Sequence, residues 1–293
     1  MNKINFIDLD TLSNGEGKLV YGNRLEAISF YETTCEAWFS DFRKEVFSAI
    51  GKRYFPVYRI ADGEMRFLFG YQINWKNKPF LSLLKYIKYE LFKSPWKTSW
   101  GESYSSTEKK QLQAILGKCI KTISSEGKLA IYWNNNGLNA FVEYNRNMEH
   151  LFKKIGVQLN RENYIPFHFA QAIIANNADR LLIGRNVLVI SGLDNPEKEA
   201  LGKRLYKIGV ANYDFYRCSP TSALKDDYTL IRPRIKPDIV LVAAGIGAAR
   251  VLADLKHLNC PVIDIGSYLN VLSGKYENAH AGFFVQPKVL ENS

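Results

Sequence analysis

The chain has 293 residues and a formal net charge of +10, with 46% hydrophobic and 23% charged residues. That length is enough for a substantial buried core, and the composition is that of an ordinary globular protein. No apolar run approaches the roughly 18 residues that span a bilayer, and the first residues do not resemble a secretory signal. These features exclude a membrane-spanning protein and favour a globular one.

The cysteines and the charge restrict the class of protein further. No C-x-x-C pair is present, so zinc-type spacing is absent and a disulfide framework is not expected. We therefore expect a reducing, cytoplasmic setting. The positive charge attracts anions such as nucleotides, nucleic acids and phospholipid surfaces, but it does not indicate which of them binds. No common nucleic-acid-binding motif is visible. The four cysteines lie far apart, at Cys35, Cys119, Cys218 and Cys260.

In chain order, the first predicted helix has an apolar face at helical spacing, formed by Phe39, Phe42, Val46 and Ile50. Two later helices are predicted over 196–208, with Asp194 or Asn195 as the N-cap before Pro196, and over 248–258. Apolar runs predict strands between and around these helices. The predicted strands cover 56–61, 128–133, 186–191, 212–217, 238–244 and 261–265.

Two of these runs, 187–190 and 239–242, are continuous and rich in β-branched residues, which is typical of strands covered on both faces. Alternation of strands and helices over the last hundred residues indicates βαβ units. We expect an α/β, Rossmann-like fold with a mostly parallel sheet flanked by helices and a more helical, aromatic N-terminal half. A single domain over 1–293 is expected, with an N-terminal helical elaboration over roughly 1–55.

The most informative motif is Arg59-Ile60-Ala61-Asp62-Gly63-Glu64, at the end of the first predicted strand. Asp62 and Glu64 could provide two hard oxygen ligands to one divalent cation, which is typically held by one or two carboxylates plus substrate phosphates. Gly63 would let a ligand approach the backbone closely, and the Arg59 guanidinium suits a phosphate. The motif predicts a metal-diphosphate site; the alternative is an acidic surface turn.

A glycine-rich loop follows the predicted strand 238–244, and Gly245 and Gly247 stand where a helix begins. Backbone N–H groups at such a place favour a phosphate. However, Arg250 occupies a position where a dinucleotide fold expects glycine, and no acidic residue follows at the spacing expected for a ribose. The loop therefore disfavours an NAD(P)-dependent oxidoreductase. It is also compatible with a tight turn that needs small residues for packing.

Small or polar residues follow three other predicted strands, where open α/β sheets bind ligands. Each could be ordinary loop chemistry, but together on one sheet edge they predict a nucleotide crevice. The residues concerned are Ser191, Gly192, Ser219, Asp264 and Gly266.

These motifs, in this order, resemble the GT-D-type glycosyltransferases of bacterial surface glycosylation. The family has an Arg-Phe-Gly-Asp-Gly-Glu type signature, which stands here as residues 59–64, with Ile60-Ala61 in place of the aromatic-glycine pair. Its later strand, glycine loop, helix and Asp-Ile-Gly segment correspond to 238–266, where the proline of the glycine loop is missing. The resemblance covers roughly 56–70 and 186–272.

The resemblance implies a glycosyltransferase that uses a nucleotide sugar, with UDP-sugar as the expected donor. It implies Mn²⁺ or Mg²⁺ at Asp62 and Glu64, with Arg59 stabilising the leaving diphosphate. The glycine loop would hold phosphate or ribose, and Asp264 would meet a ribose hydroxyl or the acceptor. The acceptor would be a glycan, a glycoprotein or a lipid-linked sugar. Asp194 and His168 lie near predicted strand ends and are candidate bases, although a histidine in such an aromatic run is more often a packed neighbour of those residues.

An alternative function, from a different class, is a non-catalytic nucleotide- or nucleic-acid-binding module with a Rossmann-like fold. A pure anion binder would not need two carboxylates beside its phosphate loop, so Asp62 and Glu64 favour the enzyme, for which no nucleic-acid partner is expected.

The run 133–137 (Trp-Asn-Asn-Asn-Gly) follows a predicted strand and could bind a sugar ring or form a turn.

The stretch 75–100 combines aromatic residues and lysines. Its apolar residues repeat at helical spacing, so it could lie on an anionic membrane and bring the enzyme to a lipid-linked acceptor at the inner face of the membrane. The alternative is a core-packed helix whose lysines extend to solvent. The residues on which both interpretations depend are Phe80, Leu84, Ile87, Leu91, Lys85, Lys88 and Lys93.

Overall fold

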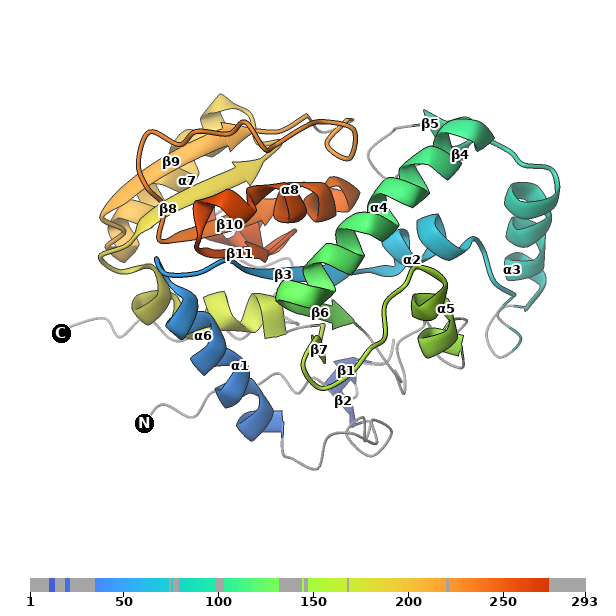
Figure 1. Cartoon of the computed structure of the whole chain (residues 1–293), viewed down its shortest axis with the longest axis horizontal. Helices are drawn as coiled ribbons and strands as arrows, with labels where there is room; N and C mark the ends of the chain where they lie inside the picture. Colours follow the sequence, from blue (N-terminus) through green and yellow to red (C-terminus); the bar gives the residue numbers. More distant parts are fainter. Residues whose placement is uncertain are drawn as a thin grey trace.

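The computed structural model shows one seven-stranded sheet with helices on both faces, and two short antiparallel strand pairs outside it (Figure 1). The strands of the main sheet are β3 (Phe55–Ile60), β6 (Lys128–Ile131), β7 (Tyr164–Pro166), β8 (Asn186–Ser191), β9 (Asn212–Arg217), β10 (Ile239–Ala243) and β11 (Pro261–Asp264). The structure describes residues 11–13, 19–21, 35–73, 75, 79–97, 103–131, 144, 147–167, 169–219 and 222–273.

Helices account for most of the remaining described chain. The α-helices are α1 (Cys35–Ala49), α2 (Asp62–Phe69), α3 (Pro79–Tyr86), α4 (Ser106–Glu126), α5 (Met148–Lys154), α6 (Phe169–Leu182), α7 (Asn195–Ile208), α8 (Ala248–Asp254) and α9 (Tyr268–Leu272). A π-helical segment η1 (Ile87–Leu91) continues α3, and the short 3₁₀ segments are η3 (Gly245–Gly247) and η4 (Leu255–Leu258). The strand pairs are β1 (Thr11–Ser13) with β2 (Leu19–Tyr21), and β4 (Trp96–Lys97) with β5 (Ser103–Tyr104).

The main sheet has the order β7-β6-β3-β11-β10-β8-β9, and every neighbouring pair in it is parallel. This confirms the predicted α/β class. All six predicted strands are present, and β8 and β9 have the predicted bounds. The sequence analysis did not predict β7, which is a short edge strand that ends in Pro166. An edge position tolerates proline because one side of the strand needs no hydrogen-bond partner.

Two layers of helices cover the sheet. Helices α4 and α8 pack against each other and against β3, so they share one face, where Figure 1 shows α4 crossing the sheet. The other face is covered by a row of four helices, in which α1 contacts α6, α6 contacts α7, and α7 contacts α9. Since α7 follows β8 and α8 follows the neighbouring β10, the chain leaves these two strands toward opposite faces. Open α/β sheets bind ligands at the carboxyl ends of strands at such a point.

The first helix is part of this second layer. Its buried face includes Trp38, Phe39 and Phe42, and the Phe39 ring lies 5.0 Å from the ring of Phe169 on α6. The region expected to be a helical elaboration over roughly 1–55 thus contains, in its described part, one packed helix and the strand pair β1–β2.

Helix α7 begins as the sequence predicts. The Asp194 carboxylate accepts a hydrogen bond from the Glu197 N–H (3.0 Å), and the Glu197 carboxylate accepts one from the Asp194 N–H (3.3 Å). Pro196 lies in the first turn, where its missing N–H costs no hydrogen bond. This reciprocal capping box confirms Asp194 as the N-cap. It also occupies the carboxylate that the sequence analysis considered as a base.

Helix α3 and the segment η1 lie within the stretch 75–100, for which the sequence allows either a membrane-surface helix or a core-packed helix. None of their side chains is buried, so the interpretation as a core-packed helix is wrong. An apolar stripe at helical spacing has the same pattern whether it meets a core or an external surface, so the sequence could not separate the two. Among the described helices, none is both long enough and apolar enough to cross a bilayer.

A substitution at Gly127, just before β6, tests how closely the start of that strand packs against β3. A Cβ atom at Gly127 would lie 2.0 Å from the carbonyl oxygen of Pro56. We therefore expect Gly127→Ala to lower the free energy of unfolding by about 2 kcal/mol or more. The control Gly184→Ala meets no atom within 4 Å, although φ is +68° there, and should cost about 1 kcal/mol from backbone strain alone. Urea unfolding measures both, and equal losses would contradict the assigned register.

Candidate functional site

The candidate site is built on two neighbouring strands, β3 and β11, where their carboxyl ends meet. Arg59 is near the end of β3 and Asp264 ends β11. The Arg59 backbone N–H donates to the Asp264 carboxylate (3.3 Å), and the Arg59 Nε donates to the Asp264 carbonyl oxygen (3.1 Å). The guanidinium Nη2 lies 3.6 Å from Asp264 Oδ1; the Asp264 side chain is buried and 12% of the Arg59 side chain is exposed. The two separated sequence motifs are therefore in direct contact.

Gly266 makes this contact sterically feasible. A Cβ atom at Gly266 would lie 1.6 Å from Arg59 Nη2, and the residue has φ +45°, which favours glycine. Its backbone N–H donates to Asp264 Oδ1 (3.0 Å). Gly266 thus leaves room for the guanidinium and also binds the carboxylate that pairs with it.

Three residues that the sequence analysis did not single out complete this cluster. The Arg59 guanidinium carbon lies 5.2 Å from the centre of the Phe167 ring, a cation–π distance. Gln171, buried on α6, donates to the carbonyl oxygen of Ile265 (3.0 Å). Tyr58 precedes Arg59 on β3, and its buried hydroxyl has no hydrogen-bond partner among the described residues. A polar residue within an apolar stretch is the only sequence signal for Gln171.

Asp62 and Glu64 lie in the first turn of α2, directly after β3. The Glu64 carboxylate accepts a hydrogen bond from the Ala61 N–H (3.0 Å), so it caps the start of the helix. The Asp62 carboxylate pairs with Arg66 one turn later, and 43% of the Asp62 side chain is exposed. The two carboxylates are thus adjacent in sequence but have different partners, since residues two apart on a helix face different directions.

Burial controls the ionisation of this cluster. Burial, together with the nearby Asp264 carboxylate, raises the pKa of Glu64 to about 7, although backbone hydrogen bonds and Arg59 act in the opposite direction. Burial also raises the pKa of Asp264, against the effect of Arg59 and of backbone hydrogen bonds. The pKa of Tyr58 is well above its usual range because of burial and the charges of Glu64 and Asp264.

The other predicted ligand-binding residues lie on the same sheet edge but farther along it. Neighbouring strands are about 4.8 Å apart, so β10 and β8 are about 10 and 14 Å from β3. Ser191 is buried at the end of β8, and its Oγ accepts from the Leu193 N–H (3.3 Å), while Gly192 is half-buried. Ser219, beyond β9, accepts from the Ser222 N–H (3.1 Å) and is farthest from the carboxylates.

The glycine loop after β10 contains two different glycines. Gly245 is exposed and has φ +53°, so it turns the chain and stays accessible. Gly247 is buried, and a Cβ atom there would lie 2.3 Å from the Cβ of Ala223. Packing against the 222–226 turn therefore accounts for glycine at position 247, while its role in ligand binding remains a prediction. Arg250 pairs with Asp254 on α8 (2.7 Å).

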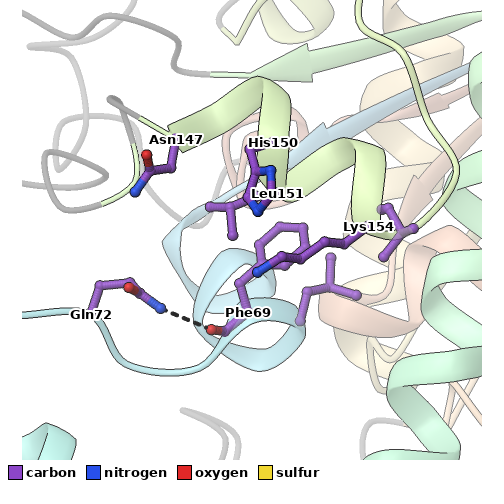
Figure 2. Close-up of a pocket in the computed structure, with 8 residues that line it drawn as sticks. Phe69, Gln72, Asn147, His150, Leu151 and Lys154 are labelled. Atoms are coloured by element: carbon purple, nitrogen blue, oxygen red, sulfur yellow. Dashed lines mark hydrogen bonds between the residues drawn. The ribbon is translucent and has the colours of Figure 1, made fainter.

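Two further sequence candidates, His168 and the run 133–137, lie outside the described residues. A cavity of about 570 Å³ lies at the other end of α2, between that helix and α5 (Figure 2). Its polar lining includes Gln72, Asn147, His150 and Lys154. The length of α2, about 12 Å, separates this cavity from the start of the helix, where Asp62 and Glu64 lie.

Comparisons with known proteins give three similar solved structures. The chain is 14% identical to a structure described as a new glycosyltransferase (domain of unknown function 1792) from Streptococcus sanguinis, with a TM-score of 0.48, over 83% of this chain and 84% of that one. Two other structures of that domain, one described as having a distinct glycosyltransferase fold and one a selenomethionine form, each give 14% identity and a TM-score of 0.45, over 84% of this chain and 87% of theirs. No protein-family model matches the chain, and no curated protein matches it. Each structure is a likeness and does not assign an activity to this chain.

A pair of glycine variants tests the Arg59–Asp264 contact. Gly266→Ala places a methyl group on the guanidinium at a position of positive φ, so we expect a loss of about 2 kcal/mol or more in the free energy of unfolding. Gly63→Ala is the matched control, because no atom lies within 4 Å of its Cβ position, and it should not reduce stability. Equal stability of the two variants in urea unfolding would show that Arg59 does not lie over Gly266.

The raised pKa of Glu64 predicts a pH dependence of stability in the metal-free protein. Between pH 4.5 and about 7 the folded chain holds a proton that the unfolded chain releases, so Glu64 costs stability as the pH rises through this window. Glu64→Gln keeps an oxygen acceptor for the Ala61 N–H but does not ionise. The free energy of unfolding of this variant, measured relative to that of the parent, should increase by roughly 1 to 3 kcal/mol between pH 4.5 and pH 7.5.

Glu197→Gln is the control for this measurement, because Glu197 has the same capping position on α7. Thermal and urea unfolding across the pH range would compare the three proteins. If the Glu64→Gln variant and the parent change in parallel over this range, Glu64 does not titrate in the buried state that the structure gives it.

Proposed function

We propose that the chain is a metal-dependent glycosyltransferase that moves a sugar from a nucleotide sugar, with UDP-sugar as the first donor to test. The observation that carries this proposal is the contact of Arg59 with Asp264 at the end of β3, the strand that leads directly into Asp62 on α2. Two motifs about 200 residues apart, which together resemble those of GT-D-type glycosyltransferases, form one cluster at the ligand-binding edge of a parallel sheet.

The residues present fit a divalent ion of the Mg²⁺ or Mn²⁺ type. Such ions take oxygen ligands and are often held by one or two carboxylates plus substrate phosphates. Asp62 is the accessible donor, since its side chain is 43% exposed and no atom lies near the Cβ position of Gly63. Glu64 would become the second donor only on leaving the Ala61 N–H from which it accepts a hydrogen bond in this structure. Among the described residues, no group of three acidic, histidine or cysteine side chains is placed to hold a metal alone, so the substrate would complete the coordination.

The sheet edge also suits the length of the donor. The diphosphate would lie near Asp62 at the end of β3, and the nucleoside would extend toward β10 and β8, about 10 to 14 Å away. The predicted ligand-binding residues along that path are Asp264 and Gly266 at the end of β11, Gly245 and Gly247 after β10, and Ser191 and Gly192 at the end of β8, of which Ser191, Gly247 and Asp264 are buried. The turn at Gly245 is exposed, which leaves its backbone accessible to a phosphate or ribose.

The chemistry required is stabilisation of the charge that develops on the leaving nucleoside diphosphate. When bound, the divalent ion would supply most of this stabilisation as a Lewis acid. Arg59 is held in one orientation by Asp264 and by the Phe167 ring, so its positive charge needs no reorganisation during the reaction. Arg66, one turn later on α2, pairs with Asp62 and brings a second positive group close to it. The acceptor would be a glycan, a glycoprotein or a lipid-linked sugar.

Asp62→Asn tests the proposal directly. The variant should bind UDP in the presence of Mn²⁺ at least tenfold more weakly than the parent, because an amide oxygen replaces a charged ligand, while its melting temperature changes little. Asp41→Asn is the control, since Asp41 is also an exposed helix residue paired with a cation, Lys44. Isothermal titration with and without a chelator measures the effect, and unchanged binding by Asp62→Asn would show that Asp62 does not hold the metal.

The same titrations distinguish the enzyme from a charge-driven binding module. Nucleotide-sugar binding through a chelated ion should need Mn²⁺ or Mg²⁺ and persist at moderate salt, whereas nucleic-acid binding falls steeply with salt. A screen of nucleotide sugars by thermal shift, with and without Mn²⁺, would identify the donor. Steeply salt-sensitive binding of RNA or DNA, with no response to any nucleotide sugar, would support the module.

A further inference from the structure

Exposed large hydrophobic side chains gather on α3, η1 and the residues beside them, a region called here the α3–η1 surface. Six of the ten large hydrophobic side chains that are exposed among the described residues belong to it. Phe80 is 69% exposed, Leu91 61% and Phe92 78%. Figure 1 shows α3 at the margin of the molecule, away from the main sheet. The six side chains are Trp75, Phe80, Leu81, Leu84, Leu91 and Phe92.

The charges on this surface are almost all positive. Within 79–97, which the structure describes, the chain has four lysines and one acidic residue, Glu90. Lys85, Lys88 and Lys93 are exposed beside the apolar side chains.

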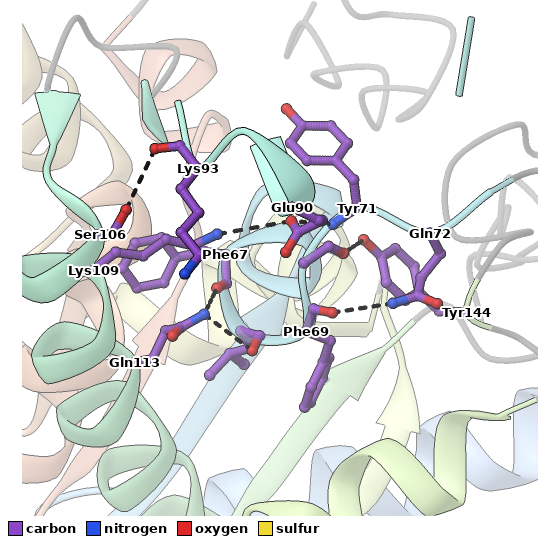
Figure 3. Close-up of polar contacts among 12 residues, drawn as sticks. Phe67, Phe69, Tyr71, Gln72, Glu90, Lys93, Ser106, Lys109, Gln113 and Tyr144 are labelled. Carbon is purple, nitrogen blue, oxygen red and sulfur yellow. Dashed lines mark hydrogen bonds and ion pairs between the residues drawn. The ribbon is translucent and has the colours of Figure 1, made fainter. Parts of the chain in front are cut away.

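The acidic residue is turned away from this surface and toward the body of the protein. The Glu90 carboxylate accepts a hydrogen bond from the Tyr71 N–H (2.9 Å) and lies 4.0 Å from Lys109 on α4 (Figure 3). The outward face of the α3–η1 surface therefore combines apolar and basic side chains.

The inner side of the surface is firmly attached to the body. The ring of Tyr89 stacks on that of Tyr71 at 4.7 Å, and Ser106 on α4 donates to the carbonyl oxygen of Lys93 (3.3 Å). A Cβ atom at Gly70 would lie 2.8 Å from the Glu90 carboxylate, so this attachment depends on glycine at the end of α2. The apolar side chains thus stand on a fixed helix that is anchored by its opposite side.

We propose that the α3–η1 surface binds the interface of an anionic lipid bilayer. A helix with leucine and aromatic side chains on one face and lysines beside them lies in the plane of such an interface, where the lysines attract anionic headgroups. Trp75 is exposed at the start of the surface, and tryptophan is enriched at the depth of the headgroups. This inference does not depend on the proposed glycosyltransferase activity.

Two other occupants fit the surface less well. A second copy of this chain, docked through the same surface, would bring two sets of lysines together, and like charges across an interface are unfavourable. The core of a protein–protein interface is depleted in lysine, whereas here Lys85 and Lys88 lie within the apolar patch. A lipid headgroup layer accommodates both features at once.

The binding has a consequence for the candidate site. Helix α2 carries Asp62 and Glu64 at its first turn and ends at Gly70, beside Glu90. A membrane-bound α3–η1 surface would therefore hold the sheet edge at a set distance from the bilayer.

Co-sedimentation of the full chain with vesicles tests the proposal. We expect binding to vesicles of phosphatidylcholine with phosphatidylglycerol, little binding to phosphatidylcholine alone, and weaker binding at high salt. Leu84→Glu, and separately Lys85→Glu with Lys88→Glu, should each weaken binding by roughly tenfold or more. All these positions are exposed, so melting temperatures should match that of the parent.

Matched controls separate this surface from the general positive charge. Leu230→Glu alters a leucine that is 75% exposed elsewhere, and Lys203→Glu with Lys207→Glu removes two exposed lysines from α7. Neither should reduce binding to the level of the α3–η1 variants. The proposal is overturned if the parent stays in solution with anionic vesicles, or if the controls lose as much binding. It is also overturned if light scattering shows a dimer that Leu84→Glu dissociates.

Discussion

The buried contact between Arg59 and Asp264 is the interaction on which the candidate site depends. Removing two charged groups from water is costly, and such a pair persists only when good geometry and further hydrogen bonds offset the cost. Here the backbone N–H groups of Arg59 and Gly266 and the carbonyl oxygen of Asp264 supply those bonds. The absence of a side chain at Gly266 gives the guanidinium its place. The pair therefore fixes the ends of β3 and β11 relative to each other.

That constraint positions the groups beyond it. Helix α2 starts directly after β3, so the position of its first turn, with Asp62 and Glu64, follows from the end of that strand. The far end of α2 meets Glu90 of η1 and the cavity beside α5. One short helix thus links three features: the carboxylates at the sheet edge, a polar cavity, and the base of the exposed α3–η1 surface.

Much of the fold could be predicted from the sequence, because buried parallel strands such as β8 and β10 have continuous β-branched runs. The motif residues were also found, but their partners were not. The sequence analysis predicts Arg59 at a phosphate and Asp264 at a ribose or acceptor, and these roles stay predictions; what it did not include is the contact between the two residues. Their pairing depends on β3 and β11 being neighbours, and strand order is not encoded in local periodicity. Likewise, the spacing of Phe80, Leu84 and Leu91 predicts an apolar face but not what covers it.

The most direct measurement is a crystal structure of the chain grown with Mn²⁺ and UDP, with the anomalous signal used to locate manganese. The account predicts one strong manganese peak within coordination distance of the Asp62 carboxylate and of the diphosphate, with the nucleoside lying along the sheet edge toward β10 and β8. The Arg59–Asp264 contact should be unchanged in that complex. A nucleotide bound away from this edge, or manganese bound elsewhere with Asp62 still paired to Arg66, would contradict the account.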